Sequence, residues 1–96
     1  MALNFKIDID RNSNKLHLKL RGDFDGMSAC ELLIVLRKNC EGVASVFIDT
    51  SGLKEIYPFG QDTFRNNLHR LKDRKFRLVF TGQNAGSIAP ERSRSF

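Results

Sequence analysis

Residues 28–49 read SACELLIVLRKNCEGVASVFID and decide the class of fold. Ser28 and Glu31 match a capping box, so the apolar run behind them is predicted to be helical to about Asn39. The β-branched run over 43–49 is typical of a central strand of a sheet. A helix that leads into such a strand indicates an α/β fold with parallel pairing.

Two alternating segments precede this stretch. Apolar and polar residues alternate over 3–10 and again over 16–21, which is the period of half-buried strands. The turn-forming cluster 11–14 lies between them and predicts a hairpin. His17 falls in the polar phase of the second strand, so we expect it to face solvent rather than to act as a catalytic base.

A second helix and a further strand follow the central strand. Pro58 suits the first turn of a helix, and from Gln61 onward apolar residues recur at the spacing of an amphipathic helix. Residues 76–80 predict the next strand, and 82–90 hold about one helical turn. The predicted order is therefore β-β-α-β-α-β.

This order implies a mixed β-sheet of four to five strands with helices mainly on one face. The chain has 96 residues, of which 41% are hydrophobic and 28% charged, as expected of one globular domain. We assign residues 1–91 to a single domain and residues 92–96 to a flexible C-terminal tail.

Composition argues against several classes of protein. The longest apolar run, 32–36, is far shorter than the roughly 20 residues that a membrane span needs. The N-terminus has no apolar core of a secretory signal, so we expect the protein in the cytoplasm. Cys30 and Cys40 are interpreted as buried small residues, and no metal or cofactor is expected because the usual ligand spacings are missing.

The net charge of +5 comes from one segment, residues 65–77, which holds six basic side chains and one acidic one. This segment is either a surface for an acidic partner or the solvated face of a helix and its exit. Nucleic-acid binding is not expected, because no aromatic residues are interleaved with the basic ones.

No set of side chains assembles into a catalytic site. Asp23 and Asp25 follow a strand, but they lack the further metal-binding acids of a phosphotransferase, so Asp25 is predicted to act in a turn and a helix cap. Residues 49–52 lack the glycine spacing of an aspartic-protease turn, and no glycine-rich phosphate loop is present. We therefore expect that the protein is not an enzyme.

Several short motifs, in order, resemble those of STAS domains (sulphate transporter and anti-sigma factor antagonist). Residues 21–25 resemble the family's Gly-x-Leu-Asp signature, and 28–32 resemble the helix that follows it. Residues 46–56 are similar to the third strand and its turn, and 80–82 with 89–91 to the fourth strand and the next helix start. The resemblance implies a STAS-like fold over nearly the whole chain.

The chain departs from the family where regulation is expected. In phosphoregulated members, an Asp-Ser-Ser-Gly stretch opens the second helix, and a partner kinase phosphorylates its second serine. Here residues 57–60 read Tyr-Pro-Phe-Gly, so Phe59 stands at the acceptor position and Gly60 is kept. The usual phosphorylation site is therefore missing, and Thr50 and Ser51 are the alternative acceptors.

In the family, this helix start and the helix behind it bind the partner protein. Phe59 would then be an apolar anchor, since aromatic residues are enriched among interface hot spots. The alternative is that Phe59 simply folds into the core. The predicted partner-binding residues are Tyr57, Phe59, Gly60, Arg65, Arg70 and Lys72.

The resemblance implies a bacterial signalling module that regulates transcription by binding a protein, similar to an anti-sigma factor antagonist. Its partner would be an anti-sigma factor of the serine-kinase type. One alternative is a STAS accessory subunit of a membrane transport complex, which would bind the transporter ATPase. Another is a nucleotide- or nucleic-acid-binding module that uses the basic second helix. A homo-oligomer is also consistent with the sequence.

Overall fold

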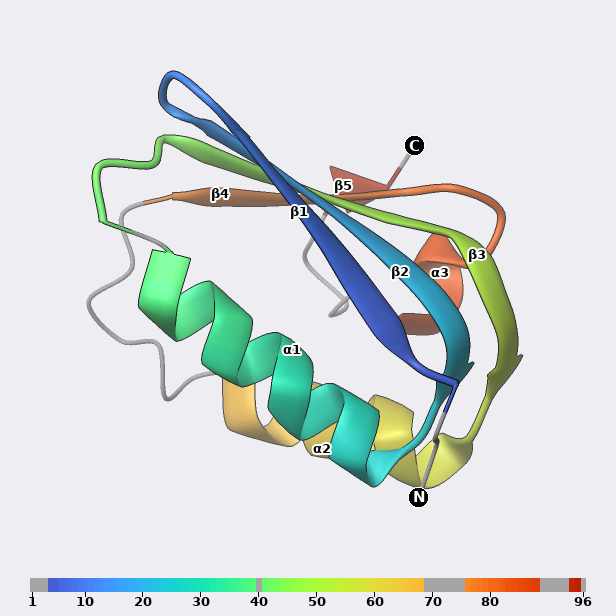
Figure 1. The fold of residues 1–96 in the computed structure, drawn as a ribbon. Coiled ribbons are helices and arrows are strands. Elements are labelled where there is room, and N and C mark those ends of the chain that lie inside the picture. Colours follow the sequence, from blue (N-terminus) through green and yellow to red (C-terminus); the bar gives the residue numbers. More distant parts are fainter. Residues whose placement is uncertain (1–3, 40, 69–75, 89–93, 96) are drawn as a thin grey trace.

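The computed structural model describes residues 4–39, 41–68, 76–88 and 94–95 (Figure 1). In these ranges the helices are α1 (Gly26–Asn39), α2 (Pro58–Asn67) and the short α3 (Ala85–Ile88). The strands are β1 (Lys6–Asn12), β2 (Lys15–Phe24), β3 (Ser45–Ile56), β4 (Arg77–Thr81) and β5 (Arg94–Ser95). No helix in the described ranges is long and apolar enough to cross a membrane.

The described strands form one mixed sheet in the order β1-β2-β3-β4-β5. β1 and β2 pair antiparallel as the predicted hairpin, and each later neighbour pairs parallel. α1 connects β2 to β3, and α2 lies between β3 and β4 in the chain; both helices cover the same face of the sheet (Figure 1). The predicted order β-β-α-β-α-β, the mixed sheet and the placement of the helices are confirmed.

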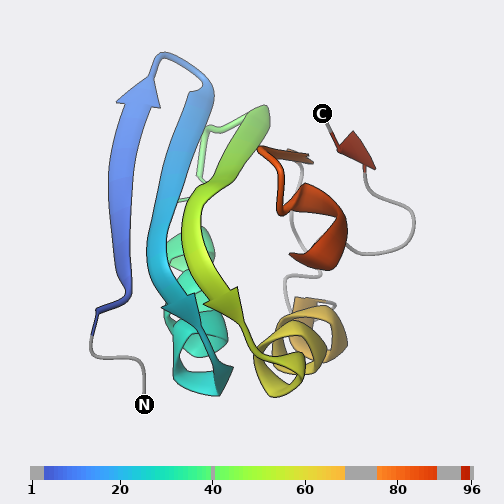
Figure 2. The same cartoon turned by 90° about the vertical axis from the view of Figure 1, so that its right-hand side faces the viewer.

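β3 is the central strand, as predicted, but it is longer than the predicted range 43–49 and continues to Ile56. The register between β2 and β3 shifts where Lys19 pairs with Asp49 and Arg21 pairs with Gly52. A bulge of this kind bends a strand without ending it. The turn residues after Asp49 therefore lie inside a curved strand (Figure 2).

The C-terminal stretch predicted as a tail contains a short strand. In β5, Arg94 pairs with Val79 and Ser95 pairs with Phe80 of β4. Parallel pairing of this kind leaves the sheet with five strands in the described ranges, the upper end of the predicted number.

The core lies between the sheet and the two long helices. Alternate residues of β2, namely Leu16, Leu18 and Leu20, point into it. Four phenylalanines form a chain of edge-to-face contacts across it: Phe5 to Phe24 at 5.9 Å, Phe24 to Phe64 at 6.4 Å and Phe64 to Phe80 at 5.9 Å between ring centroids. These contacts join the hairpin, α2 and β4 into one packed unit.

α1 is buried on one face only. Leu32 and Leu36 lie in the core, whereas Ile34 is 46% exposed. The prediction that Cys30 is a buried small residue is wrong, because Cys30 is exposed on the outer side of this helix. Cys40 lies outside the described residues. One apolar face of α1 packs on the sheet, and the apolar residues of its other face remain in solvent.

Two phenylalanines of α2 make a matched pair for a stability test, since Phe64 is fully buried and Phe59 is 73% exposed. We expect Phe64→Ala to lower the free energy of unfolding by about 3–5 kcal/mol, because it opens a cavity between the rings of Phe24 and Phe80. Phe59→Ala should cost less than about 1 kcal/mol. Urea unfolding followed by circular dichroism measures both values. Equal losses would contradict the placement of α2.

Candidate protein-binding surface

The starts of α1 and α2 lie side by side at the carboxyl ends of β2 and β3 (Figure 2). β2 and β3 run parallel, and their last paired residues are Phe24 and Ile56. Each long helix begins within two residues of its strand's end. The backbone N–H of Tyr57 donates to the carbonyl oxygen of Phe24 at 3.0 Å, which ties the second junction to the first.

Asp25 caps α1. Its carbonyl oxygen accepts from the N–H of Ala29 at 3.0 Å, and its Oδ1 accepts from the N–H of Ser28 at 2.9 Å. The predicted role of Asp25 in a cap is confirmed, whereas the prediction that Ser28 caps the helix is wrong. Ser28 lies inside the first turn, and its hydroxyl can donate to the Asp25 carboxylate at 3.0 Å or to the Asp23 carbonyl at 2.9 Å.

These bonds also set the charge state of the cap. The N–H and the hydroxyl of Ser28 hold the pKa of the Asp25 carboxyl below its usual value, with the N–H as the main cause. The carboxylate therefore stays ionised at the positive end of the α1 dipole, where a negative charge is favourable.

α2 begins with Pro58 in its first turn, as predicted, and its cap residue Tyr57 makes no side-chain capping bond. The backbone of Gly60 is held against the end of β2. A side chain at Gly60 would place its Cβ 2.7 Å from the Phe24 carbonyl oxygen and 2.8 Å from the Asp25 backbone. Gly60 is buried, and its lack of a side chain allows this close approach. At the predicted surface it therefore holds the backbone in position and offers no side chain to a partner.

Phe59 points outward, with 73% of its surface exposed, and so does not fold into the core. Its ring rests on Gly26, where an added Cβ would lie 2.6 Å from a ring carbon. A hollow of about 450 Å³ lies beside the ring between the two helix starts. It is lined by Asp25, Gly26, Met27, Cys30, Phe59 and Thr63.

The other predicted partner-binding residues are spread out. Tyr57 is 47% exposed but is not among the residues that line the hollow. Arg65 is exposed near the end of α2, but its separation from Phe59 is not one of the helical spacings that bring side chains together. Arg70 and Lys72 lie outside the described residues. Of the predicted residues that the structure describes, only Phe59 lines the hollow; Tyr57 and Gly60 are its near neighbours in the chain, and Arg65 lies further along α2.

Sequence reasoning missed five residues of this surface: Asp25, Gly26, Met27, Cys30 and Thr63. Met27 is 55% exposed, and its flexible apolar side chain lines the same hollow as the ring of Phe59. The position of Asp25 as the helix cap could have indicated two of these residues from the sequence. A helix that begins directly after Asp25 places Met27 and Cys30 three residues apart on one face.

The alternative phosphate acceptors lie elsewhere, in β3. Thr50 is fully buried and donates its hydroxyl to the carbonyl oxygen of Thr81 at 2.7 Å, so a kinase has no access to it in this structure. Ser51 is exposed, and its N–H donates to Oδ1 of Asp49 at 2.9 Å. This N–H lowers the pKa of the Asp49 carboxyl, so a phosphate on Ser51 would meet an ionised neighbour.

No cluster of three or more metal-ligating side chains occurs among the described residues. No protein-family model matches the chain, and no curated protein matches it.

Solved structures share the fold. The anti-sigma factor antagonist SpoIIAA in its unphosphorylated form is 10% identical, with a TM-score of 0.63 over 96% of this chain and 86% of that one. An uncharacterized protein from Shewanella loihica with a SpoIIAA-like fold is 19% identical, with a TM-score of 0.57 over 100% and 87%. The Mglu crystal structure is 20% identical, with a TM-score of 0.66 over 90% of this chain.

The chain spans about 20% of the length of the Mglu chain but most of the SpoIIAA chain. At these identities the likeness shows the fold alone. The chain has a SpoIIAA-like, and so STAS-like, fold, which confirms the architecture that the sequence motifs implied.

The Asp25 cap predicts a specific response to acid. Because the folded-state pKa is lowered, the ionised carboxyl stabilises the fold fully above its ordinary pKa of about 4 and less as pH falls below it. Asn also caps helices, so Asp25→Asn should lose only the charge, worth about 0.3–1 kcal/mol at pH 7. By pH 3 we expect the variant's deficit in unfolding free energy to shrink.

Urea unfolding at pH 7 and pH 3 measures the difference. Asp23→Asn is the matched control, because the carboxylate of Asp23 has no bonding partner in the described ranges. A deficit for Asp25→Asn that stays constant between the two pH values would contradict the capping account.

Proposed function

We propose that this chain is a non-enzymatic regulatory module that binds a protein partner at the starts of α1 and α2. The observation that carries the proposal is Phe59, which is 73% exposed and seated on Gly26 at the mouth of a hollow. A large aromatic side chain in solvent, fixed in position, is the kind of residue that anchors interfaces.

The surroundings of Phe59 favour binding of a protein over binding of a small polar ligand. Met27, which is 55% exposed, lines the same hollow as Phe59, and Tyr57, two residues before Phe59, is 47% exposed. Covering one such side chain contributes about 1.5–3 kcal/mol, and the hollow of about 450 Å³ can accept a side chain of the partner. The backbone contacts of Gly60 and Tyr57 hold the surface in place before binding, which lowers the entropy cost of association.

Phe59 also bears on regulation. By the resemblance of the motifs, it stands where phosphoregulated STAS domains carry the acceptor serine. A phenyl ring cannot take a phosphoryl group, so we propose that binding at this surface is not switched by phosphorylation at this position. Control of binding would then act through the amount of the protein, through its partner, or through another position such as the exposed Ser51.

The proposed partner is a cytoplasmic anti-sigma factor of the serine-kinase type. SpoIIAA, which shares the fold, is itself an anti-sigma factor antagonist. A transporter ATPase is the alternative partner, in which case the chain would serve as an accessory subunit of a transport complex. Both partners would meet the same surface.

Affinity capture from a lysate of the source cells tests the surface, with the bound proteins quantified by mass spectrometry. We expect Phe59→Asp to reduce recovery of the specific partner at least about tenfold, because the change buries a charge in the interface. Ile34→Asp is the matched control, since Ile34 is 46% exposed but lies further along α1.

Recovery of an anti-sigma factor that depends on Phe59 would support the proposal. Recovery of a transporter ATPase that depends on Phe59 would replace the antagonist role with the accessory-subunit role. Equal recovery with the wild type and Phe59→Asp would contradict the proposed surface itself.

A further inference from the structure

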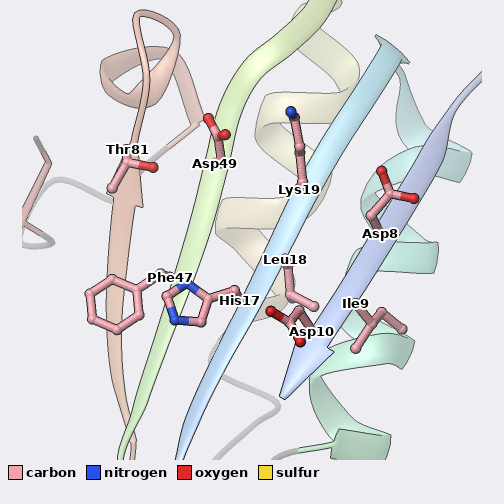
Figure 3. Close-up of a pocket in the computed structure, with 9 residues that line it drawn as sticks. All are labelled: Asp8, Ile9, Asp10, His17, Leu18, Lys19, Phe47, Asp49 and Thr81. Carbon is pink, nitrogen blue, oxygen red and sulfur yellow. The ribbon is translucent and has the colours of Figure 1, made fainter. Parts of the chain in front are cut away.

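The face of the sheet opposite α1 and α2 carries a second hollow, of about 490 Å³ (Figure 3). It is lined by Asp8, Ile9, Asp10, His17, Leu18, Lys19, Phe47, Asp49 and Thr81. These residues come from four neighbouring strands, β1 to β4. The hollow therefore lies across the middle of the sheet and shares no lining residue with the Phe59 surface.

Two rings form the centre of this face. His17 and Phe47 are direct neighbours in the β2–β3 register, and their ring centroids are 5.0 Å apart with an angle of 14° between the planes. Figure 3 shows the two rings lying together over the strands. The prediction that His17 faces solvent is confirmed, but its ring is also fixed by the contact with Phe47. A fixed pair of parallel rings offers a flat surface on which a planar group can stack.

Charged side chains on this face lie in bands, which are rows of residues that pair with one another across neighbouring strands. In the band of the rings, Asp10 pairs with His17. In the next band, Lys19 lies between Asp8 and Asp49. The charged groups that line the hollow are thus three aspartates and one lysine. On the other side of the rings, the neighbouring band is positive and contains Lys15 and Arg77.

Most of these carboxylates already have a positive or hydrogen-bonding neighbour. Asp8 forms an ion pair with Arg21 at 3.0 Å, and Asp49 accepts from the N–H of Ser51 and lies near Lys19. Asp10 differs, because its carboxylate has no hydrogen bond or ion pair with any described residue. It lies next to the paired rings and is available to a ligand.

We infer that this sheet face binds an extended segment of a partner protein that inserts an arginine side chain beside the rings. A guanidinium group is planar, stacks on aromatic faces, and pairs with a carboxylate through two parallel hydrogen bonds. The ring pair supplies the stacking surface and Asp10 supplies the carboxylate. The excess of aspartate around the hollow disfavours a phosphate group there.

The bands also determine which residues of this protein lie near the arginine of the partner segment. Successive outward residues of a strand repeat every 6.6–6.8 Å or so, and an extended peptide has the same repeat. Consider a segment that lies along the strands with its arginine at the rings. On one side of the arginine, the residue two positions away then lies over Lys15 and Arg77. The expected motif is an arginine with an acidic residue two positions before or after it.

A peptide titration tests this inference independently of the Phe59 surface. The probe is the peptide Thr-Glu-Thr-Arg-Thr, acetylated and amidated, added to isotope-labelled protein and followed by amide chemical shifts. We expect shifts confined to β1, β2 and β3 around His17 and Phe47. Citrulline in place of arginine, which removes the charge and keeps the shape, should weaken binding at least about fivefold.

The protein variant Asp10→Asn should weaken binding of the arginine peptide by a similar factor, whereas Glu31→Gln, which removes an exposed acid on α1, should leave it unchanged. Equal binding of the arginine and citrulline peptides would overturn the inference, as would shifts spread over both faces or none at all. Tighter binding of a single-stranded oligonucleotide at the same residues would overturn it in favour of a nucleotide site.

Discussion

The molecule depends on one backbone contact, in which Gly60 is pressed against the end of β2. A Cβ at Gly60 would lie 2.7 Å from the carbonyl oxygen of Phe24. These two backbone segments can approach this closely only because glycine has no side chain. The contact fixes the start of α2 beside the start of α1. It thereby directs Phe59 away from the core and onto Gly26, and it directs Phe64 inward, where it joins the rings of Phe24 and Phe80.

The two faces of the sheet therefore differ in what arranges their side chains. The face that carries α1 and α2 is closed by apolar packing, and the proposed binding surface lies beside the carboxyl ends of β2 and β3, where both helices begin. Neither α1 nor α2 covers the opposite face, whose paired rings and bands of charge follow the strand register. A partner at the proposed helix-start surface and one at the proposed sheet surface would not compete for the same side chains, because the two hollows share no lining residue.

The order of elements could be predicted because it is encoded locally: alternating strands, Asp25 as a cap and Pro58 in a first helical turn all act over a few residues. The length of β3 could not, since Gly52 reads as a turn until its pairing with Arg21 across a bulge is known. The same limit applies to the contact between His17 and Phe47, which lie 30 positions apart and meet only through the β2–β3 register. Likewise, whether Phe59 faces solvent depends on a contact between Gly60 and a different strand.

Solvent accessibility of the Phe59 ring in the free protein is the most direct measure of the central claim, a preformed aromatic anchor outside the core. Fluorinated phenylalanine at all 8 positions gives separate fluorine resonances, and Phe59→Leu identifies the one from Phe59. With a soluble gadolinium probe, we expect strong broadening of the Phe59 resonance and weak broadening of those from the buried rings of Phe24, Phe64 and Phe80. A Phe59 resonance as protected as that of Phe64 would contradict it.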